Sequence, residues 1–291
     1  MKAGTALRAV RKRRSIYLDI RRSLFAVLRF KQESTNLPTR MTPQVVPQRL
    51  WHEPFTIRAY EMDAAGKASP AMLCDYLQEA AGNHARHLGF DIATLRTRGF
   101  TWMLSRLHVR LFRQPAWRET ITIETWPSGT RGRLIATREF IGRDASGVEL
   151  LRATTDWLYV DVASRRICRV PDDLMQFVPT DQPPALAPDD TRPPEIETPE
   201  WSVTLPVRRC DLDLNEHVNN VRYIEWMFEP LPAAFAAGKR VTEMEILFRQ
   251  GAEYGDSAIS QAAPSGDDAV LHRIVRTGDQ SVLVLARTRW A

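Results

Sequence analysis

The feature that most constrains the fold of this 291-residue chain is a repeated pattern on either side of a proline-rich segment. Seven prolines fall between Pro179 and Pro199, with few apolar residues among them. A segment of this kind cannot bury a core, so we expect residues 172–200 to run extended as a semi-rigid linker. The flanking residues 49–171 and 201–291, called the first unit and the second unit below, are then two domains.

Each unit begins with a predicted strand, continues with a helix and ends with several strands. In the first unit, Ser69 is the expected N-cap, Pro70 opens the helix and Gly89 is a plausible C-cap. The strand patterns that precede the two helices cover Phe55–Asp63 and Val203–Arg209. Alternation of apolar and acidic residues after the second helix is typical of a half-buried antiparallel strand.

Polar side chains of three kinds stand at alternate positions of the second unit: Asp213, Asn215 and His217. If this segment is extended, the three side chains leave the same face. That face would carry a carboxylate, an amide and the side-chain type that titrates closest to neutral pH. A helical pattern follows at once, with Asn219 or Asn220 as its N-cap. The polar groups should therefore meet where free helical N–H groups favour developing negative charge.

The string D-x-N-x-H-x-N-N-x-x-Y, which ends at Tyr223, resembles the acyl-ACP thioesterases. These enzymes release fatty acids from acyl carrier protein. The resemblance extends from about Trp51 to Ala291 and includes the run from Phe100 to Arg106. It implies an α+β fold of two tandem hotdog domains, each an antiparallel β-sheet wrapped around a long α-helix. It also implies hydrolysis of the fatty acyl-ACP thioester, which terminates fatty acid synthesis.

The catalytic residues that we expect from this motif are Asp213, Asn215 and His217. His217 is the natural base or water-orienting group. Asp213 could hold the imidazole in one tautomer, or could act on water or on the carbonyl itself. The Asn215 amide could hold the thioester oxygen together with N–H groups at the helix start. Attack by water and an acyl-aspartate intermediate both remain open at this point, and polar caps and turns can use the same residue types.

The two units differ at this motif. A shift of 150 positions aligns Arg58 with Arg208, Asp63 with Asp213, Ala65 with Asn215, and Lys67 with His217. The first unit therefore keeps the aspartate but lacks the amide and the imidazole. We expect one active site per chain, supplied by the second unit, with the first unit building the acyl pocket.

Two positions depart from the family pattern. The resemblance places a glutamate and, in plant members, a cysteine after the second helix, but Gly251 and Ala252 stand there. Glu253 lies two residues beyond Gly251 and would share its face on an extended strand. Glu253 is therefore a tentative catalytic residue, although an exposed strand glutamate would look the same.

The residues that we expect to bind substrate are Met72, Leu73, Leu77, Trp102, Met103, Asn219 and Tyr223. The apolar members could line a tunnel for the acyl chain, in which each buried CH₂ contributes about 0.8 kcal/mol. Ordinary core packing accounts for the same residues equally well.

Acyl carrier protein is acidic, so its hydrolase needs a basic docking face. The candidate clusters are Arg131 with Arg133 and Arg138, Arg165 with Arg166 and Arg169, and Arg208 with Arg209 and Arg222. A homodimer is a further possibility. An acyl-CoA thioesterase of the same fold and a non-hydrolytic acyl-binding protein are the alternative functions.

Net charge limits the partners further. Residues 1–40 hold 11 Lys or Arg against two acidic residues, a net of +9, so the remaining 29 basic and 33 acidic residues give −4. The basic extension, residues 1–48, therefore carries the positive excess, which argues against a nucleic-acid-binding core. It could be disordered, a targeting segment such as the transit peptides of plant members, a membrane-surface helix, or a leader assigned in error before Met41.

The three cysteines, Cys74, Cys168 and Cys210, are widely spaced and predict neither a disulfide framework nor a metal site. No apolar run approaches the roughly 20 residues that span a bilayer. We therefore expect a cytoplasmic protein that needs no cofactor or metal and does not insert into the membrane.

Overall fold

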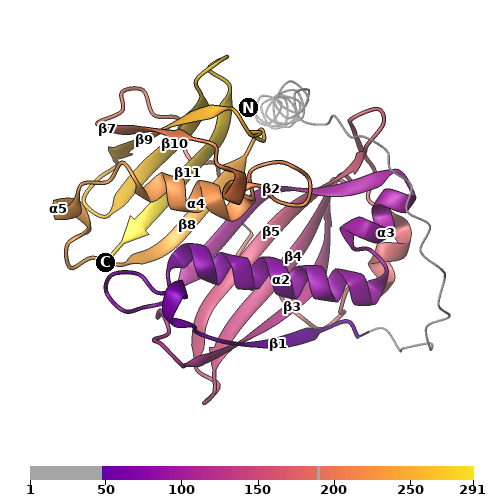
Figure 1. Ribbon diagram of the computed structural model, residues 1–291. Coiled ribbons are helices and arrows are strands. Elements are labelled where there is room, and N and C mark those ends of the chain that lie inside the picture. Colours follow the sequence, from indigo (N-terminus) through magenta and orange to yellow (C-terminus); the bar gives the residue numbers. More distant parts are fainter. Residues whose placement is uncertain (1–47, 189–190) are drawn as a thin grey trace, which may run out of the picture.

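The structure is a computed structural model that describes residues 48–188 and 191–291 (Figure 1). The expectations for the basic extension fall outside this range, apart from its last residue. The first unit contains β1 (Trp51–Thr56), α2 (Pro70–Leu88), α3 (Ile92–Thr97), β2 (Phe100–Leu111), β3 (Thr120–Arg131), β4 (Ile135–Asp144), β5 (Glu149–Asp161) and β6 (Arg166–Cys168). The second contains β7 (Trp201–Pro206), α4 (Asn220–Phe228), α5 (Ala233–Ala236), β8 (Val241–Phe248), β9 (Ser257–Pro264), β10 (Ala269–Arg276) and β11 (Val282–Trp290).

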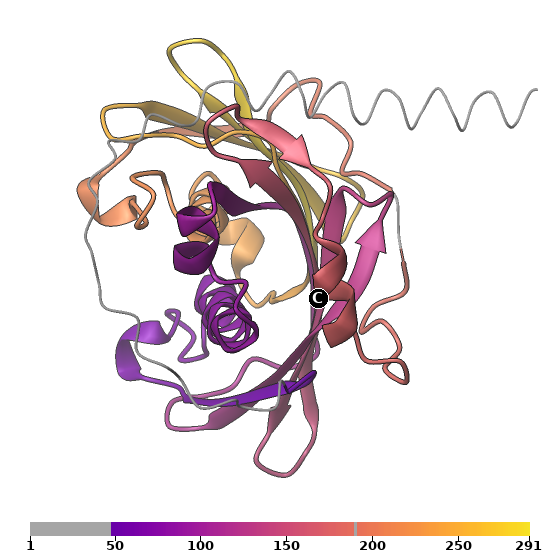
Figure 2. The same cartoon turned by 90° about the vertical axis from the view of Figure 1, so that its right-hand side faces the viewer.

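One antiparallel sheet runs through both units. Its strand order is β1-β3-β4-β5-β2 in the first unit and β8-β11-β10-β9-β7 in the second, joined where β2 pairs with β8. The two orders are the same when read outward from that junction. The sheet curves around α2 and α4, which lie on its concave face (Figure 2). The architecture confirms the predicted fold class of two hotdog units, each an antiparallel sheet wrapped around a helix.

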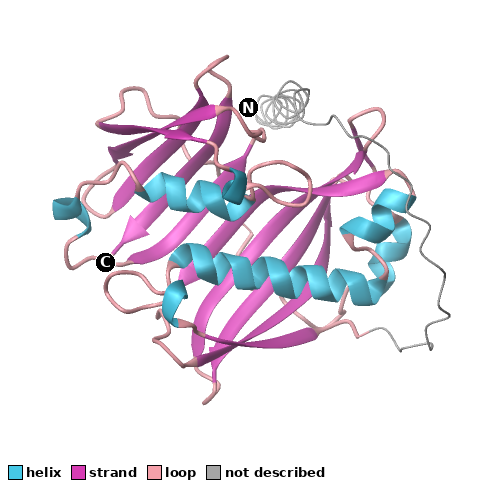
Figure 3. Ribbon diagram, viewed as in Figure 1, coloured by secondary structure: helices cyan, strands magenta, loops and turns pink. Residues whose placement is uncertain are grey.

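The main hydrophobic core lies between the sheet and the helices that Figure 3 shows across its face. It takes Leu73 and Leu77 from α2, Ile224 from α4, and Ile246 and Val284 from the second half of the sheet. The two helices also pack against each other. Because apolar residues of both units share this core, each helix buries part of its apolar face against the other unit.

The predicted helix caps are confirmed. Ser69 Oγ accepts a hydrogen bond from the Met72 N–H at 3.2 Å, and Pro70 is the first helical residue. Gly89 ends α2 with φ +75°, a conformation that costs glycine little because it has no Cβ. At α4 the N-cap is Asn219, whose Oδ1 accepts from the Val221 N–H at 3.1 Å.

The predicted strands before the helices are wrong at their ends. β1 stops at Thr56, and a 3₁₀ turn at Ala59–Glu61 follows instead of a strand to residue 63. β7 likewise stops at Pro206, before the turn Arg209–Asp211. In both units a buried carboxylate explains the turn, because it accepts a hydrogen bond from the backbone N–H three residues earlier. The pairs are Glu61 with Arg58 and Asp211 with Arg208, each at 2.7 Å.

The proline-rich segment has few regular elements, although a 3₁₀ helix, Asp172–Phe177, stands at its start. We expected a linker that buries no apolar groups, but Leu186 and Ile196 are buried. The Ala185 N–H donates to the buried Glu139 carboxylate at 3.1 Å. The segment is therefore attached to the units at several points rather than free of them.

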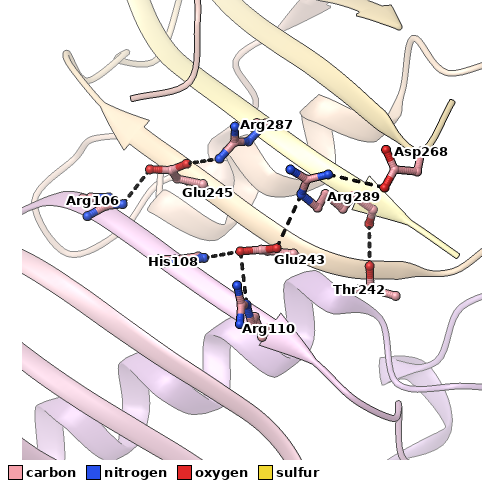
Figure 4. A network of polar contacts seen from close by, with 9 residues as sticks. All are labelled: Arg106, His108, Arg110, Thr242, Glu243, Glu245, Asp268, Arg287 and Arg289. Atoms are coloured by element: carbon pink, nitrogen blue, oxygen red, sulfur yellow. Dashed lines mark hydrogen bonds and ion pairs between the residues drawn. The ribbon is translucent and has the colours of Figure 1, made fainter. Parts of the chain in front are cut away.

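Charged side chains from both units meet at the junction of β2, β8 and β11 (Figure 4). Glu245 is buried and lies between Arg106, at 2.6 Å, and Arg287, at 3.0 Å. Glu243 accepts a hydrogen bond from His108 Nε2 at 2.6 Å and a further hydrogen bond from Arg110. The hydrogen bond with His108 is the main reason that the pKa of Glu243 falls to about 2.

Candidate active site

The loop before α4 is a hydrogen-bonded turn and not the extended segment that alternation predicted. The Asp213 N–H donates to the His217 carbonyl at 2.7 Å, and Glu216 has φ +61°. Asp213 Oδ1 accepts from the N–H groups of Asn215, at 2.7 Å, and His217, at 3.4 Å. The carboxylate thus stabilises the turn by binding its inner N–H groups. Asp213, Asn215 and His217 do come together, but through this turn.

The Asn215 side chain lies between the Asp213 carboxylate of its own loop and the Arg96 guanidinium of the first unit. Its Nδ2 donates to Asp213 Oδ2 at 3.1 Å. Its Oδ1 accepts a hydrogen bond from Arg96 Nη2, at the last turn of α3. Since an amide oxygen only accepts and an amide nitrogen only donates, these two partners fix which end of the amide faces each way.

The hydrogen bonds of His217 determine its tautomer. Nδ1 lies 2.6 Å from the Asn215 carbonyl oxygen, which can only accept, so Nδ1 carries the proton. In the neutral ring, Nε2 then holds a lone pair. This nitrogen is buried and has no hydrogen-bond partner among residues 48–188 and 191–291. A buried ring nitrogen with a free lone pair is suited to accept a proton.

Glu253 is the acid nearest to that lone pair. Its Oε1 lies 3.4 Å from His217 Nε2, an ion-pair distance if the ring is protonated, and the two residues form a β-bridge. The prediction that Glu253 lies on a strand is wrong. β8 ends at Phe248, and Glu253 lies in the loop before β9. The buried Tyr223 hydroxyl accepts from the neighbouring Ala252 N–H at 2.8 Å, which holds this loop against α4. Burial raises the pKa of Tyr223.

Residues of α2 reach the start of α4. Gln78 Nε2 donates to Asn219 Oδ1 at 3.3 Å, and Asp75 lies 3.8 Å from Arg222. Gln78 and Arg96 belong to the first unit, yet both contact the site loop or its helix. Neither residue could be predicted from the sequence, because they stand 141 and 119 positions from their partners and no local pattern marks them.

A pocket begins beside the first residues of α4 and runs between the helices and the sheet. The space between its walls is about 310 Å³ with open solvent included, and the enclosed part is much smaller. Its lining is mainly apolar and comes from both units: Cys74, Leu77, Gln78, Leu104, Leu107, Phe140, Thr155, Trp157, Asn220, Val221, Ile224 and Phe248. Val221 follows His217 by four residues, so the pocket starts close to the polar turn.

The expected substrate-binding residues are distributed unevenly around this pocket. Leu77 lines it, and Asn219 is the N-cap beside it. Leu73 and Tyr223 are buried in the shared core. Trp102 packs with Tyr159 near the end of α2, whereas Met103 packs against Leu158 and Val160 in a separate small cluster. Met72, at the first turn of α2, is not among the lining residues of this pocket.

The arginine clusters proposed for docking contain side chains that already have partners within the protein. Arg138 is buried against His84 Nδ1, at 3.0 Å, so it cannot belong to the exposed cluster with which it was grouped. Burial lowers the pKa of Arg138 to about 10, and burial together with the Arg138 charge lowers the pKa of His84 to about 3. Arg209 stacks over the exposed Tyr254 ring at 4.1 Å, beside the site loop.

Among the described residues, no three His, Cys, Asp or Glu side chains are grouped as metal ligands would be. In the same part of the chain, no helix combines the length and the apolar character required to span a membrane.

Comparisons with known proteins relate the chain to one family. Residues 48–178 match the family model of the acyl-ACP thioesterase N-terminal domain, and residues 197–291 match that of the C-terminal domain. The oleoyl-acyl carrier protein thioesterase 1 of Arabidopsis thaliana is 28% identical over 82% of this chain and 75% of its own length. The oleoyl-acyl carrier protein thioesterase of Coriandrum sativum is 30% identical over 78% and 66%.

A solved structure agrees with these matches. The 12:0-ACP thioesterase of Umbellularia californica superposes with a TM-score of 0.75 at 26% identity, over 83% of this chain and 97% of that one. The two family models lie on the two hotdog units that share one sheet. The chain therefore belongs to the acyl-ACP thioesterase family.

Proposed function

We propose that this protein hydrolyses the thioester of fatty acyl-ACP and releases a free fatty acid and the carrier protein. The observation that carries the proposal is the buried Nε2 lone pair of His217, which lies 3.4 Å from the Glu253 carboxylate. The lining of an apolar pocket begins three residues further along the chain, at Asn220. A proton acceptor together with an apolar pocket is what hydrolysis of an acyl thioester requires.

The first step is attack by water on the thioester carbonyl carbon. His217 Nε2 takes one proton of the water as the new C–O bond forms. The developing oxyanion accepts hydrogen bonds from the second N–H of the Asn215 amide and from an N–H of the first turn of α4 that the helix itself does not use. Glu253 then faces an imidazolium and stabilises its charge.

Collapse of the tetrahedral intermediate completes the reaction. The carbonyl forms again, the C–S bond breaks, and the imidazolium returns its proton to the sulfur of the leaving thiol. Asp213 is poorly suited to attack the carbonyl, because Oδ1 binds two backbone N–H groups and Oδ2 binds the Asn215 amide. Attack by water is therefore favoured over an acyl-aspartate intermediate.

The acyl chain would enter the pocket between α2, α4 and the sheet, with Leu77, Phe140 and Ile224 among its contacts. Carrier protein would dock on the face that bears the site loop. Two exposed side chains, Leu214 and Tyr254, lie there, and Arg209 stacks on Tyr254. The cytoplasmic location, the homodimer and the domain boundaries remain predictions.

The test is hydrolysis of acyl-ACP and acyl-CoA of matched chain lengths, measured by thiol release. We expect turnover of acyl-ACP to exceed that of acyl-CoA, and His217→Ala to lower both about 10²-fold to 10⁴-fold. Faster turnover of acyl-CoA would instead support the related thioesterase function. Tight binding of the acyl substrate with no thiol released would identify a non-hydrolytic acyl-binding protein.

A further inference from the structure

The active-site turn of the second unit is contacted by a cation of the first unit. Arg96 Nη2 donates a hydrogen bond to Asn215 Oδ1, and Asn215 Nδ2 donates to Asp213 Oδ2 at 3.1 Å. The amide thus forms the middle of a chain that runs from a guanidinium to a carboxylate. These hydrogen bonds link residues that are far apart in the sequence, since Arg96 and Asn215 are separated by 119 positions.

The short helix α3, which carries Arg96, is capped at its start and anchored by a buried side chain. Arg96 stands in the last turn of α3, whose N-cap Asp91 accepts from the Ala93 and Thr94 N–H groups at 3.0 and 3.2 Å. Leu95, the residue before Arg96, is fully buried. A short helix that is capped and anchored in this way can hold the base of a long arginine side chain in place.

The charge of Arg96 affects the amide in two ways. It keeps the oxygen of Asn215 turned toward α3, so that the nitrogen and its second proton face the site. It also withdraws electron density from the amide, and hydrogen bonds in a chain polarise one another in this manner. The remaining N–H of Asn215 becomes a stronger donor toward an oxyanion.

We propose that Arg96 is a positioning residue for thioester hydrolysis, which orients and polarises the Asn215 amide from the first unit. The role rests on the proposed function. It corrects the expectation that the second unit supplies the whole site, since the first unit then contributes to catalysis as well as to the acyl pocket.

A double-mutant cycle in the full-length chain tests the role. The variants are Arg96→Ala, Asn215→Ala and the double variant, with steady-state kinetics on acyl-ACP. We expect Arg96→Ala to lower kcat about 10-fold to 100-fold with KM changed by less than about 2-fold. In the Asn215→Ala background the same substitution should have no further effect, because Arg96 acts through that amide. Arg96→Lys, which keeps the charge but not the fork, should recover part of kcat.

The matched control is Arg98→Ala, two residues further along and outside the site. It should leave kcat within about 2-fold, and thermal unfolding should show that all variants are folded. Additive losses in the double variant, a raised KM at unchanged kcat, or an equal loss in Arg98→Ala would each overturn the role of Arg96. A wild-type chain that hydrolyses no acyl-ACP would overturn the proposed function itself, and the role of Arg96 with it.

Discussion

Lys67 and His217 occupy the same position in two copies of one turn. The Asp63 N–H donates to the Lys67 carbonyl at 2.7 Å, as the Asp213 N–H donates to the His217 carbonyl at the same distance. Lys67 forms a β-bridge with Ala116, whereas His217 forms one with Glu253. The backbone of the site therefore exists twice, and only the second copy carries an imidazole opposite a carboxylate.

Replacing His217 with alanine removes the proposed proton acceptor of the site turn. We expect turnover of acyl-ACP to fall about 10²-fold to 10⁴-fold, while the unfolding temperature changes little. Lys67→Ala, at the equivalent position of the first unit, is the control and should keep nearly full activity. Rates close to wild type in His217→Ala would exclude His217 from the mechanism.

Asp213→Asn should lower activity about 100-fold or more, although it keeps an oxygen for the backbone N–H groups. The reason is that its new NH₂ group would face the Asn215 NH₂ group, and two donors cannot bind each other. Asp63→Asn also keeps the turn, and Ala65 offers no amide to disturb, so its activity should stay within about 2-fold of wild type. Equal losses in steady-state rate would contradict a single site per chain.

Glu253 should matter through the charge that it presents to His217. Glu253→Gln removes that charge and should lower kcat about 10-fold, because the imidazolium loses its nearest counter-ion. Its 53% side-chain exposure predicts little change in stability. Gly251→Glu, added to that variant, places a carboxylate at the position that the family resemblance indicates and should restore part of kcat. Unchanged turnover in Glu253→Gln would leave catalysis to Asp213, Asn215 and His217.

The junction network should make stability depend on acid pH. The pKa of Glu243 is lowered to about 2 in the folded protein, below the roughly 4.3 of an unfolded glutamate. The folded state therefore binds fewer protons, and the stabilisation is present above about pH 4.3 and is lost as the pH falls toward 2. Glu243→Gln should be less stable at pH 7 and should lose less on acidification. Parallel unfolding-temperature curves from pH 6 to 2.5 would contradict this assignment.

Local patterns in the sequence were sufficient for the two helices beside the site and for their caps. The caps at Ser69 and Asn219 and the two helices were predicted correctly because capping depends on neighbouring residues only. The strands before the helices were placed too late, because a buried carboxylate at Glu61 and another at Asp211 turn the chain earlier than the apolar pattern suggests.

The sequence by itself determined the repeat, the fold class and the residues Asp213, Asn215 and His217. Only the tertiary structure decided how they meet, through a turn rather than a strand, and which distant groups join them. Arg96 and Gln78 reach the site because β2 pairs with β8 and the two helices pack together. Contacts of this kind depend on the register of a sheet across more than a hundred residues, and the spacing of side chains along the chain carries no record of it.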